Sequence, residues 1–314
     1  MSPHTLHSYR DSLSLLLRFV ASAKKCPVVT LDIKDMTSDR VISFLKHLEE
    51  KRKNTSSTRN VRLAAVHAFF RFLAKRYPDQ LEHCQRVLAI PFKRTRSRPI
   101  EYLEYEEIRA VLGTIDRTIR DGRRDYALFV SLFNTGARVQ EILDLRATDL
   151  QLIKPFHVRL FGKGRKERLC PLWHETANVL QAFLEEQGLD PRSPERIFRN
   201  HRRQPLTRYG VRYLLAKYCD LARKSTPTLR GKRLHPHSMR HSTAVHLLKA
   251  GVDISTISQW LGHASLETTN RYATVDLDMK REAISKVARI AEERGSPTAP
   301  WRKDTSILSW LESL

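Results

Sequence analysis

The sequence is poor in cysteine, and its cysteines are not arranged to build a disulfide framework or a metal site. There are four in 314 residues, far apart and without a CxxC pair: Cys26, Cys84, Cys170 and Cys219. Small secreted domains and zinc modules both need closely spaced cysteines. We therefore expect free, buried thiols in a protein of the reducing cytosol.

Long apolar runs are also missing. No stretch approaches the roughly 18 consecutive apolar residues that a membrane-spanning helix requires. The opening residues, MSPHTLHSYR, are polar and lack the apolar core of a secretion signal. Hydrophobic residues nevertheless make up 41% of the chain, and 314 residues are enough for two domains. We therefore expect a folded, two-domain, cytoplasmic protein.

Acidic residues are scarce relative to basic ones. Lys and Arg number 56 against 34 Asp and Glu, which gives a formal net charge of +22. Such an excess repels itself, and nucleic acid relieves the repulsion with release of its counterions. A ribosomal or membrane-surface protein could be equally basic. The cations are spread over many segments rather than one tail, which favours a folded nucleic-acid groove.

Residues 1 to about 90 carry helical signals almost throughout. Ser2-Pro3 can open a first helix, since proline is tolerated at that position, and Thr37 can cap a second. Apolar residues at helical spacing predict a third helix over about 57–77 and a fourth over 81–88. The segment PFKRTRSRP (91–99), with two prolines around four cations, is typical of a linker.

From residue 101 to about 290 helices still dominate, with one exception. HVRLFGKGRKERLCPL (157–172) alternates like a strand, turns at Gly162 and Gly164, and resumes. Helices are expected near 174–187, 207–223, 236–250, 253–261 and 265–272, with a last long helix over about 276–293.

The C-terminal residues after PTAPW (297–301) predict one further short helix. Its apolar stripe consists of Ile307, Trp310, Leu311 and Leu314. So short a helix is marginal alone, so it would pack on its own domain or on a neighbouring subunit.

Two segments place cations near helix starts. A protein that cuts a phosphodiester without a metal needs a nucleophile, fixed cations and an acid. LFNTGARVQEILDLR (132–146) has Arg138 at a helix start and Glu141 three residues on. HPHSMRHSTAVHLL (235–248) has His237 and Arg240 near a helix N-terminus that itself favours phosphate.

Each of these segments also has an ordinary interpretation. Arg138 and Glu141 could be a surface ion pair. His235, His237 and His241 could bind a metal, although no cysteine or carboxylate completes such a site and the surrounding arginines and lysines would repel a cation.

Two more segments hold single residues of interest. WLGHASLETTNRYATV (260–275) has His263 in a turn and Tyr272 near the end of a short helix. Lys163 lies at the glycine-rich tip of the predicted hairpin, where a lysine can reach into a groove. Alone, these would be a solvated histidine, a half-buried tyrosine and a soluble turn residue.

In this order and spacing, the segments resemble the signature boxes of the tyrosine recombinase family, which includes phage integrases and Xer-type enzymes. The boxes are T-G-A-R-V-Q-E-I-L, G-K-G-R-K-E-R, H-S-M-R-H-S-T-A and L-G-H-A-S-L-E-T-T-N-R-Y. The helical N-terminal third also resembles that family's core-binding domain. The implied fold is mainly α: a helical SAM-like core-binding domain, then a mostly helical α+β catalytic domain with a small β-hairpin sheet.

The resemblance divides the chain into four parts. The expected parts are a DNA-binding core-binding domain over 1–92, a basic linker over 93–103, a catalytic integrase domain over 104–293 and a tail over 294–314. The two domains would grip the two sides of a DNA duplex as a C-shaped clamp.

The resemblance also implies a role for each candidate residue. Arg138 and Arg240 would clamp the non-bridging phosphate oxygens. Lys163 would protonate the leaving 5′ oxygen, and His237 would assist as a general acid/base. His263 would hydrogen-bond the phosphate.

The remaining implied roles concern the nucleophile and its support. Glu141 would support the active site, and Tyr272 would attack the phosphate. The product would be a 3′-phosphotyrosine with a free 5′-hydroxyl, which needs no nucleotide cofactor and no metal. Two guanidiniums and a helix N-terminus would favour the phenolate of a residue whose pKa is ordinarily about 10.

The implied partner is double-stranded DNA, with a homotetramer acting on two sites, alone or with partner recombinases, in a nucleoid-associated location. Integration or excision of a mobile element is the favoured role. A type IB topoisomerase-like enzyme and a catalytically degenerate DNA-binding relative remain alternatives. A metal-dependent nuclease would need clustered carboxylates, which the sequence does not offer at suggestive spacing.

Overall fold

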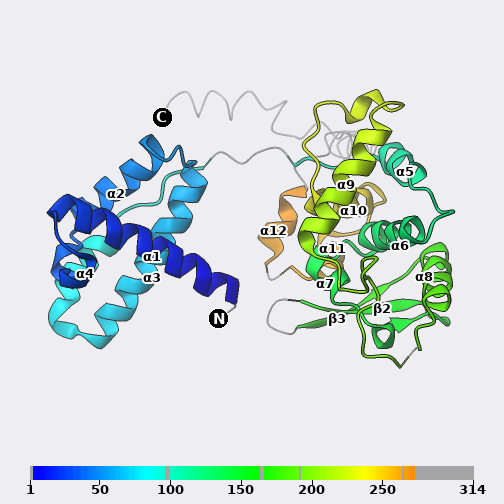
Figure 1. The fold of residues 1–314 in the computed structure, drawn as a ribbon, viewed down its shortest axis with the longest axis horizontal. Coiled ribbons are helices and arrows are strands. Elements are labelled where there is room, and N and C mark those ends of the chain that lie inside the picture. Colours follow the sequence, from blue (N-terminus) through cyan, green and yellow to red (C-terminus); the bar gives the residue numbers. More distant parts are fainter. Residues whose placement is uncertain (1–2, 96–99, 163–165, 191, 264, 273–314) are drawn as a thin grey trace, which may run out of the picture. The chain divides into compact units, whose positions relative to one another are not determined.

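The computed structural model describes residues 3–95, 100–162, 166–190, 192–263 and 265–272 (Figure 1). The chain divides into two compact units, Met1–Arg98 and Pro99–Leu314, and each is described on its own.

The first unit consists of four helices around one apolar core, as the periodicity predicts. The helices are α1 (Pro3–Lys24), α2 (Ser38–Glu50), α3 (Ser56–Arg76) and α4 (Leu81–Leu88). Thr37 caps α2, as expected, because its side chain accepts a hydrogen bond from the Arg40 backbone N–H at 3.3 Å. The core includes Leu16, Phe44, Leu48, Leu63 and Phe70.

The second unit is also mainly helical. Its helices are α5 (Tyr105–Gly113), α6 (Arg120–Thr135), α7 (Val139–Leu143), α8 (His174–Gln187), α9 (Arg208–Ala222), α10 (Pro236–Lys249), α11 (Ile254–Leu261) and α12 (Leu266–Asn270). The helix expected over 265–272 thus ends at Asn270, two residues before Tyr272. No helix in the described ranges is long and apolar enough to cross a membrane.

The predicted hairpin is confirmed, and it belongs to a three-stranded antiparallel sheet. Strands β2 (His157–Phe161) and β3 (Glu167–Pro171) pair with Val158 opposite Cys170. A short third strand, β1 (Leu150–Gln151), adds to β2 and was not predicted. Val158, Leu160 and Cys170 are buried in the main core of this unit.

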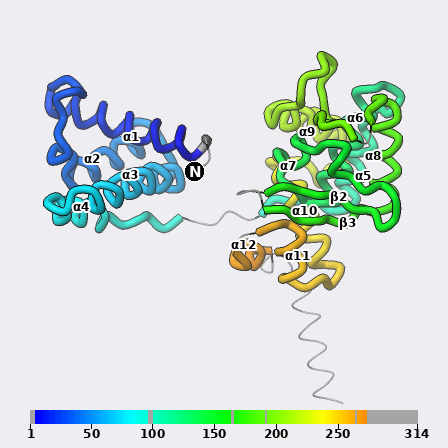
Figure 2. Tube along the Cα trace, turned by 90° about the horizontal axis from the view of Figure 1, so that it is seen from below, coloured from blue at the N-terminus to red at the C-terminus, as the bar shows by residue number. Residues whose placement is uncertain are grey.

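Helices α11 and α12 lie next to each other at one side of the second unit (Figure 2), and Tyr272 follows α12 along the chain. α11 contacts α10, α12 and β3. A small apolar cluster joins α10 to α11 and Tyr272: Ala244, Val245, Leu248, Ile257, Leu261 and Tyr272. Tyr272 is therefore fixed by packing as well as by its place in the chain.

Several predictions from the sequence lie outside the described residues. These are Lys163 at the hairpin tip, the centre of the linker over 96–99, the helix over 276–293 and the C-terminal helix. The four cysteines are free, as expected; three are buried, but Cys26 is only half-buried.

Candidate active site

The fold brings three distant segments together. Arg138 and Glu141 come from the junction of α6 and α7, and His237 and Arg240 come from the first turns of α10. His263 and Tyr272 flank α12. Burial, and after it the charges of Arg240 and Arg138, lower the pKa of both His237 and His263, so these groups share one electrostatic environment.

Arg240 is the most enclosed charged group of the site, with 1% of its surface exposed. Its Nη1 donates to the Gly136 carbonyl at 2.8 Å, and its Nη2 donates to the Leu261 carbonyl at 2.7 Å. Burial, and then the charge of Arg138, lowers its pKa to about 10, so it stays protonated at pH 7. The two carbonyls hold the guanidinium plane in one orientation.

Gly136 makes this arrangement possible. It ends α6 in the left-handed conformation, with φ of 56°. A Cβ at this position would lie 2.5 Å from Leu261 Cδ2. Only glycine allows the chain to turn here and the carbonyl to face Arg240.

Arg138 is held by Glu141, which also holds a second arginine. Glu141 Oε1 accepts from Arg138 Nη1 at 2.8 Å, and Oε2 accepts from the Arg138 backbone N–H at 3.0 Å and from Arg168 Nη2 at 2.7 Å. The Arg138 side chain remains 40% exposed, so part of its guanidinium is accessible to a ligand. Burial alone would raise the pKa of Glu141, but Arg168 and then Arg138 hold that pKa below its usual range.

Arg168 was missed in the sequence analysis. It lies on β3 at a partly buried position between exposed neighbours, and its Nε donates to the Trp260 carbonyl at 2.9 Å. A signal was available, because an arginine at an inward position of an alternating strand requires a buried partner.

Tyr272 and His263 lie with their rings nearly parallel. The ring centroids are 6.4 Å apart at 11°, and His263 Nδ1 is hydrogen-bonded to Thr269 Oγ1 at 2.7 Å. Burial, followed by the charge of Arg240, lowers the pKa of His263 to about 4. His263 is therefore a neutral hydrogen-bonding group at pH 7.

The Tyr272 hydroxyl has a partner that the sequence analysis considered only as a metal ligand. His241 Nδ1 lies 2.9 Å from Tyr272 Oη. The tyrosine is 3% exposed, and this burial raises its pKa, while the charges of Arg240 and Arg271 act in the opposite direction. The ring of His237 meets that of His241 edge-on, with centroids 4.6 Å apart.

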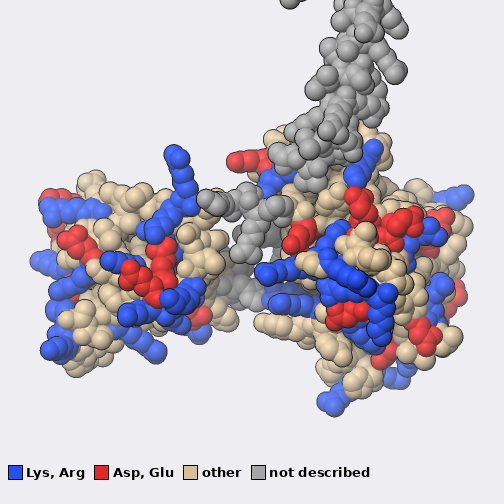
Figure 3. Space-filling view, turned by 90° about the horizontal axis from the view of Figure 1, so that it is seen from above, with Lys and Arg blue, Asp and Glu red and all other residues tan. Residues whose placement is uncertain are grey.

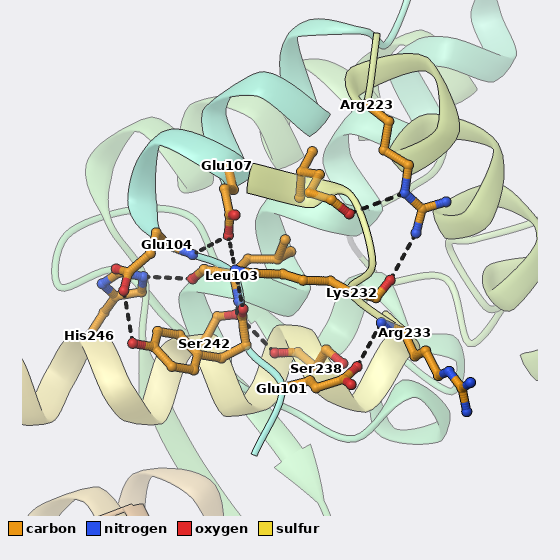
Figure 4. A network of polar contacts seen from close by, with 12 residues as sticks. Glu101, Leu103, Glu104, Glu107, Arg223, Lys232, Arg233, Ser238, Ser242 and His246 are labelled. Atoms are coloured by element: carbon orange, nitrogen blue, oxygen red, sulfur yellow. Dashed lines mark hydrogen bonds and ion pairs between the residues drawn. The ribbon is translucent and has the colours of Figure 1, made fainter. Parts of the chain in front are cut away.

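A network of polar contacts anchors α10, the helix that carries Arg240 and His241 (Figure 4). The Leu103 backbone N–H donates to Ser242 Oγ at 2.8 Å, and the Leu103 carbonyl lies 3.0 Å from His246 Nε2. Glu107, on α5, pairs with Lys232 at 2.6 Å in the loop before α10. These contacts fix the face of α10 that turns away from Arg240.

The charge of the surface suits a large anion. On the face that Figure 3 shows, Lys and Arg side chains lie on both units. Across the ranges that the structure covers, no group of three or more His, Cys, Asp or Glu residues could hold a metal ion. The site brings together two arginines, histidines whose pKa values are lowered, and a buried phenol.

Comparison with known sequences identifies relatives over the whole chain. The model of the phage integrase family matches residues 101–278, and that of the phage integrase N-terminal SAM-like domain matches residues 1–77. A candidate integrase/recombinase of Sinorhizobium fredii, y4rC, is 37% identical over 100% of this chain and 92% of its own. The tyrosine recombinase XerC of Pelobacter propionicus is 31% identical over 91% of this chain and 89% of its own.

Solved structures share the fold. The XerH site-specific recombinase, in a pre-cleavage complex with its difH substrate, gives a TM-score of 0.68 over 89% of this chain and 78% of that one, at 23% identity. The Tn1549 transposon integrase, in complex with transposon right end DNA, gives 0.68 over 92% and 95%, at 17% identity.

Proposed function

Because this chain belongs to the phage integrase family and is a tyrosine-type site-specific DNA recombinase, we propose that it cuts and rejoins DNA through a 3′-phosphotyrosine at Tyr272. The observation that supports this proposal most directly is that Tyr272 is buried beside Arg240 and His263. In the proposed reaction Oη attacks the phosphorus, the 5′ oxygen leaves, and the protein stays linked to the 3′ end. The 5′-hydroxyl of another strand then attacks the phosphotyrosine and restores a phosphodiester.

The proposed roles of the cations follow from their contacts. Arg240 presents a guanidinium whose plane is already held by two carbonyls, so little reorganisation is needed when charge develops on the phosphate. Arg138 is proposed to contact the phosphate with the exposed part of its guanidinium, which Glu141 holds in place. Lys163 is proposed to protonate the 5′ oxygen, and His237 and His263 to complete the contacts to the phosphate.

We further propose that four protomers act on two double-stranded DNA sites and that the biological role is integration, excision or transposition of a mobile element. Support comes from the Tn1549 transposon integrase, a structural neighbour, and from the net charge of +22. The N-terminal unit, proposed to end near residue 92, would bind DNA together with the catalytic unit.

Covalent trapping tests the chemistry. The protein is mixed with a pool of nicked suicide duplexes in EDTA, denatured in SDS and examined for protein-linked DNA, beside Tyr272→Phe. We expect an adduct with the wild type and none with the variant. A wild type that binds DNA but forms no adduct, even on the ends of its own element, would support the catalytically degenerate alternative. Relaxation of a plasmid that lacks the site would support the topoisomerase alternative.

A further inference from the structure

His241 is placed to act on the nucleophile directly. Its Nδ1 lies 2.9 Å from Tyr272 Oη, within the reach of a general base. Among the described residues, no other hydrogen bond to this hydroxyl is found. The two rings are tilted by 60°, with centroids 5.6 Å apart, so the contact is made through the ring edge that carries Nδ1.

The reaction needs such a group. A phenol is protonated at pH 7, and the burial of Tyr272 makes loss of its proton harder still. The proton must therefore leave as Oη attacks, and a positioned acceptor is required. The two arginines cannot serve, because they remain charged.

Two other bases of the site, Glu141 and His263, have hydrogen-bond partners of their own. Both oxygens of Glu141 accept hydrogen bonds from Arg138 or Arg168. Nδ1 of His263 is paired with Thr269, and the planes of the His263 and Tyr272 rings are within 11° of parallel, with centroids 6.4 Å apart. His241 is the base whose ring nitrogen meets the hydroxyl.

We propose, building on the proposed function, that His241 is the proton acceptor for Tyr272. As Oη bonds to phosphorus and the bond from phosphorus to O5′ breaks, the phenolic proton moves to Nδ1. The leaving O5′ takes its proton from the general acid, for which Lys163 is proposed above. In rejoining, the 5′-hydroxyl loses its proton to the same group, and Oη leaves with the proton returned from Nδ1. Each transfer is balanced, and the enzyme ends as it began.

The surroundings keep His241 neutral until DNA binds. Burial is the main reason why its pKa falls to about 3, and electrostatic interactions with the neighbouring imidazoles and with Arg271 and Arg240 lower it further. A neutral imidazole with its proton on Nε2 has a free lone pair on Nδ1. A bound phosphate places a negative charge among these cations and raises the basicity of the ring. Proton acceptance is thereby coupled to the presence of substrate.

The test measures single-turnover cleavage of a nicked suicide duplex by wild type and His241→Asn. Asparagine keeps a polar atom near the position of Nδ1 but is not a base. We expect cleavage to slow about 10²-fold, a typical contribution of general acid–base catalysis, with DNA affinity unchanged. His157→Asn is the matched control, because His157 is another half-buried histidine whose Nδ1 lies 2.9 Å from an oxygen, that of Pro155. It should cleave like wild type.

Two modified reagents separate this role from a structural one. A 5′-bridging phosphorothiolate duplex has a leaving group that needs no protonation. This duplex should restore cleavage by the Lys163→Ala variant but not by the His241→Asn variant. Ring-fluorinated tyrosine at position 272 is more acidic and should reduce the defect of His241→Asn.

The outcomes distinguish the two proposals. If wild type forms no adduct, the proposed function fails. If wild type forms an adduct and His241→Asn cleaves at the same rate, only the role of His241 fails. Rescue of His241→Asn by the phosphorothiolate would place His241 on the leaving-group side and overturn the proposal, and so would a defect unchanged by fluorination.

Discussion

Replacement of Glu141 by glutamine should weaken the catalytic unit more than any exposed charge change. Glu141 accepts three hydrogen bonds and is buried, and Arg168 beside it is only 11% exposed. Removing one partner of a buried pair costs about 3–5 kcal/mol. In the variant Arg138 can be hydrated, so we expect the free energy of unfolding to fall by an amount at the lower end of this range, about 3 kcal/mol. For a unit of this size each kcal/mol lowers the Tm by about 2–4 °C, so we expect a loss of about 6–12 °C.

Tryptophan fluorescence measures this in the full chain. Residues 1–98 contain no tryptophan, and Trp173 and Trp260 lie among the described residues of the second unit, so the change in emission on unfolding does not come from the first unit. Glu106→Gln is the matched control, since its pair with Arg109 is exposed on both sides. Surface pairs contribute about 0–1 kcal/mol, so its Tm should fall by at most about 4 °C.

The pH dependence gives a second check on the same variant. The native pKa of Glu141 is lowered, so its stabilisation is present above the unfolded pKa of about 4.3 and is lost as the pH falls through the native value. The gap in Tm between wild type and Glu141→Gln should therefore be full at pH 7 and shrink in acid. A gap below about 2 °C at pH 7, or one that persists unchanged at low pH, would refute the reasoning.

Three further predictions concern the rest of the site. Arg240→Lys should slow cleavage about 10²-fold without loss of DNA binding, because one ammonium cannot reach two carbonyls and a phosphate; adduct formation and gel shift check this. Gly136→Ala should destabilise by about 1–3 kcal/mol more than Gly188→Ala, measured by Trp fluorescence, since both have positive φ but only the former meets Leu261. Stability should fall between pH 7 and 5, less steeply in His241→Asn, because the unfolded chain takes up protons near pH 6.5 that the folded site does not.

Much of the architecture was predictable because its signals are local. A cap acts within three residues, and an apolar stripe repeats every three or four, so α2 after Thr37 and α4 over Leu81–Leu88 were found close to their true bounds. The hairpin was found from its alternation and its glycines. Strand β1 was missed because two residues carry no periodicity of their own; they pair because β2 provides a partner.

The residues expected at the site were named from boxes in the sequence, but their physical relations are tertiary. Arg240 is oriented by the carbonyl of Gly136, 104 positions earlier in the chain. Arg168 meets Glu141 because β3 lies beside the start of α7. No local pattern reports either contact.

By itself, the sequence determined most of the described helices, the hairpin and the basic character, since these follow from neighbours along the chain, while Tyr272 became the candidate nucleophile through the resemblance of the sequence boxes to a family. The tertiary structure alone decided that the Tyr272 hydroxyl meets His241, 31 positions earlier on α10. The packing of α11 and α12 against α10 brings those two atoms within hydrogen-bonding distance, and such proximity is a property of the folded core rather than of either segment.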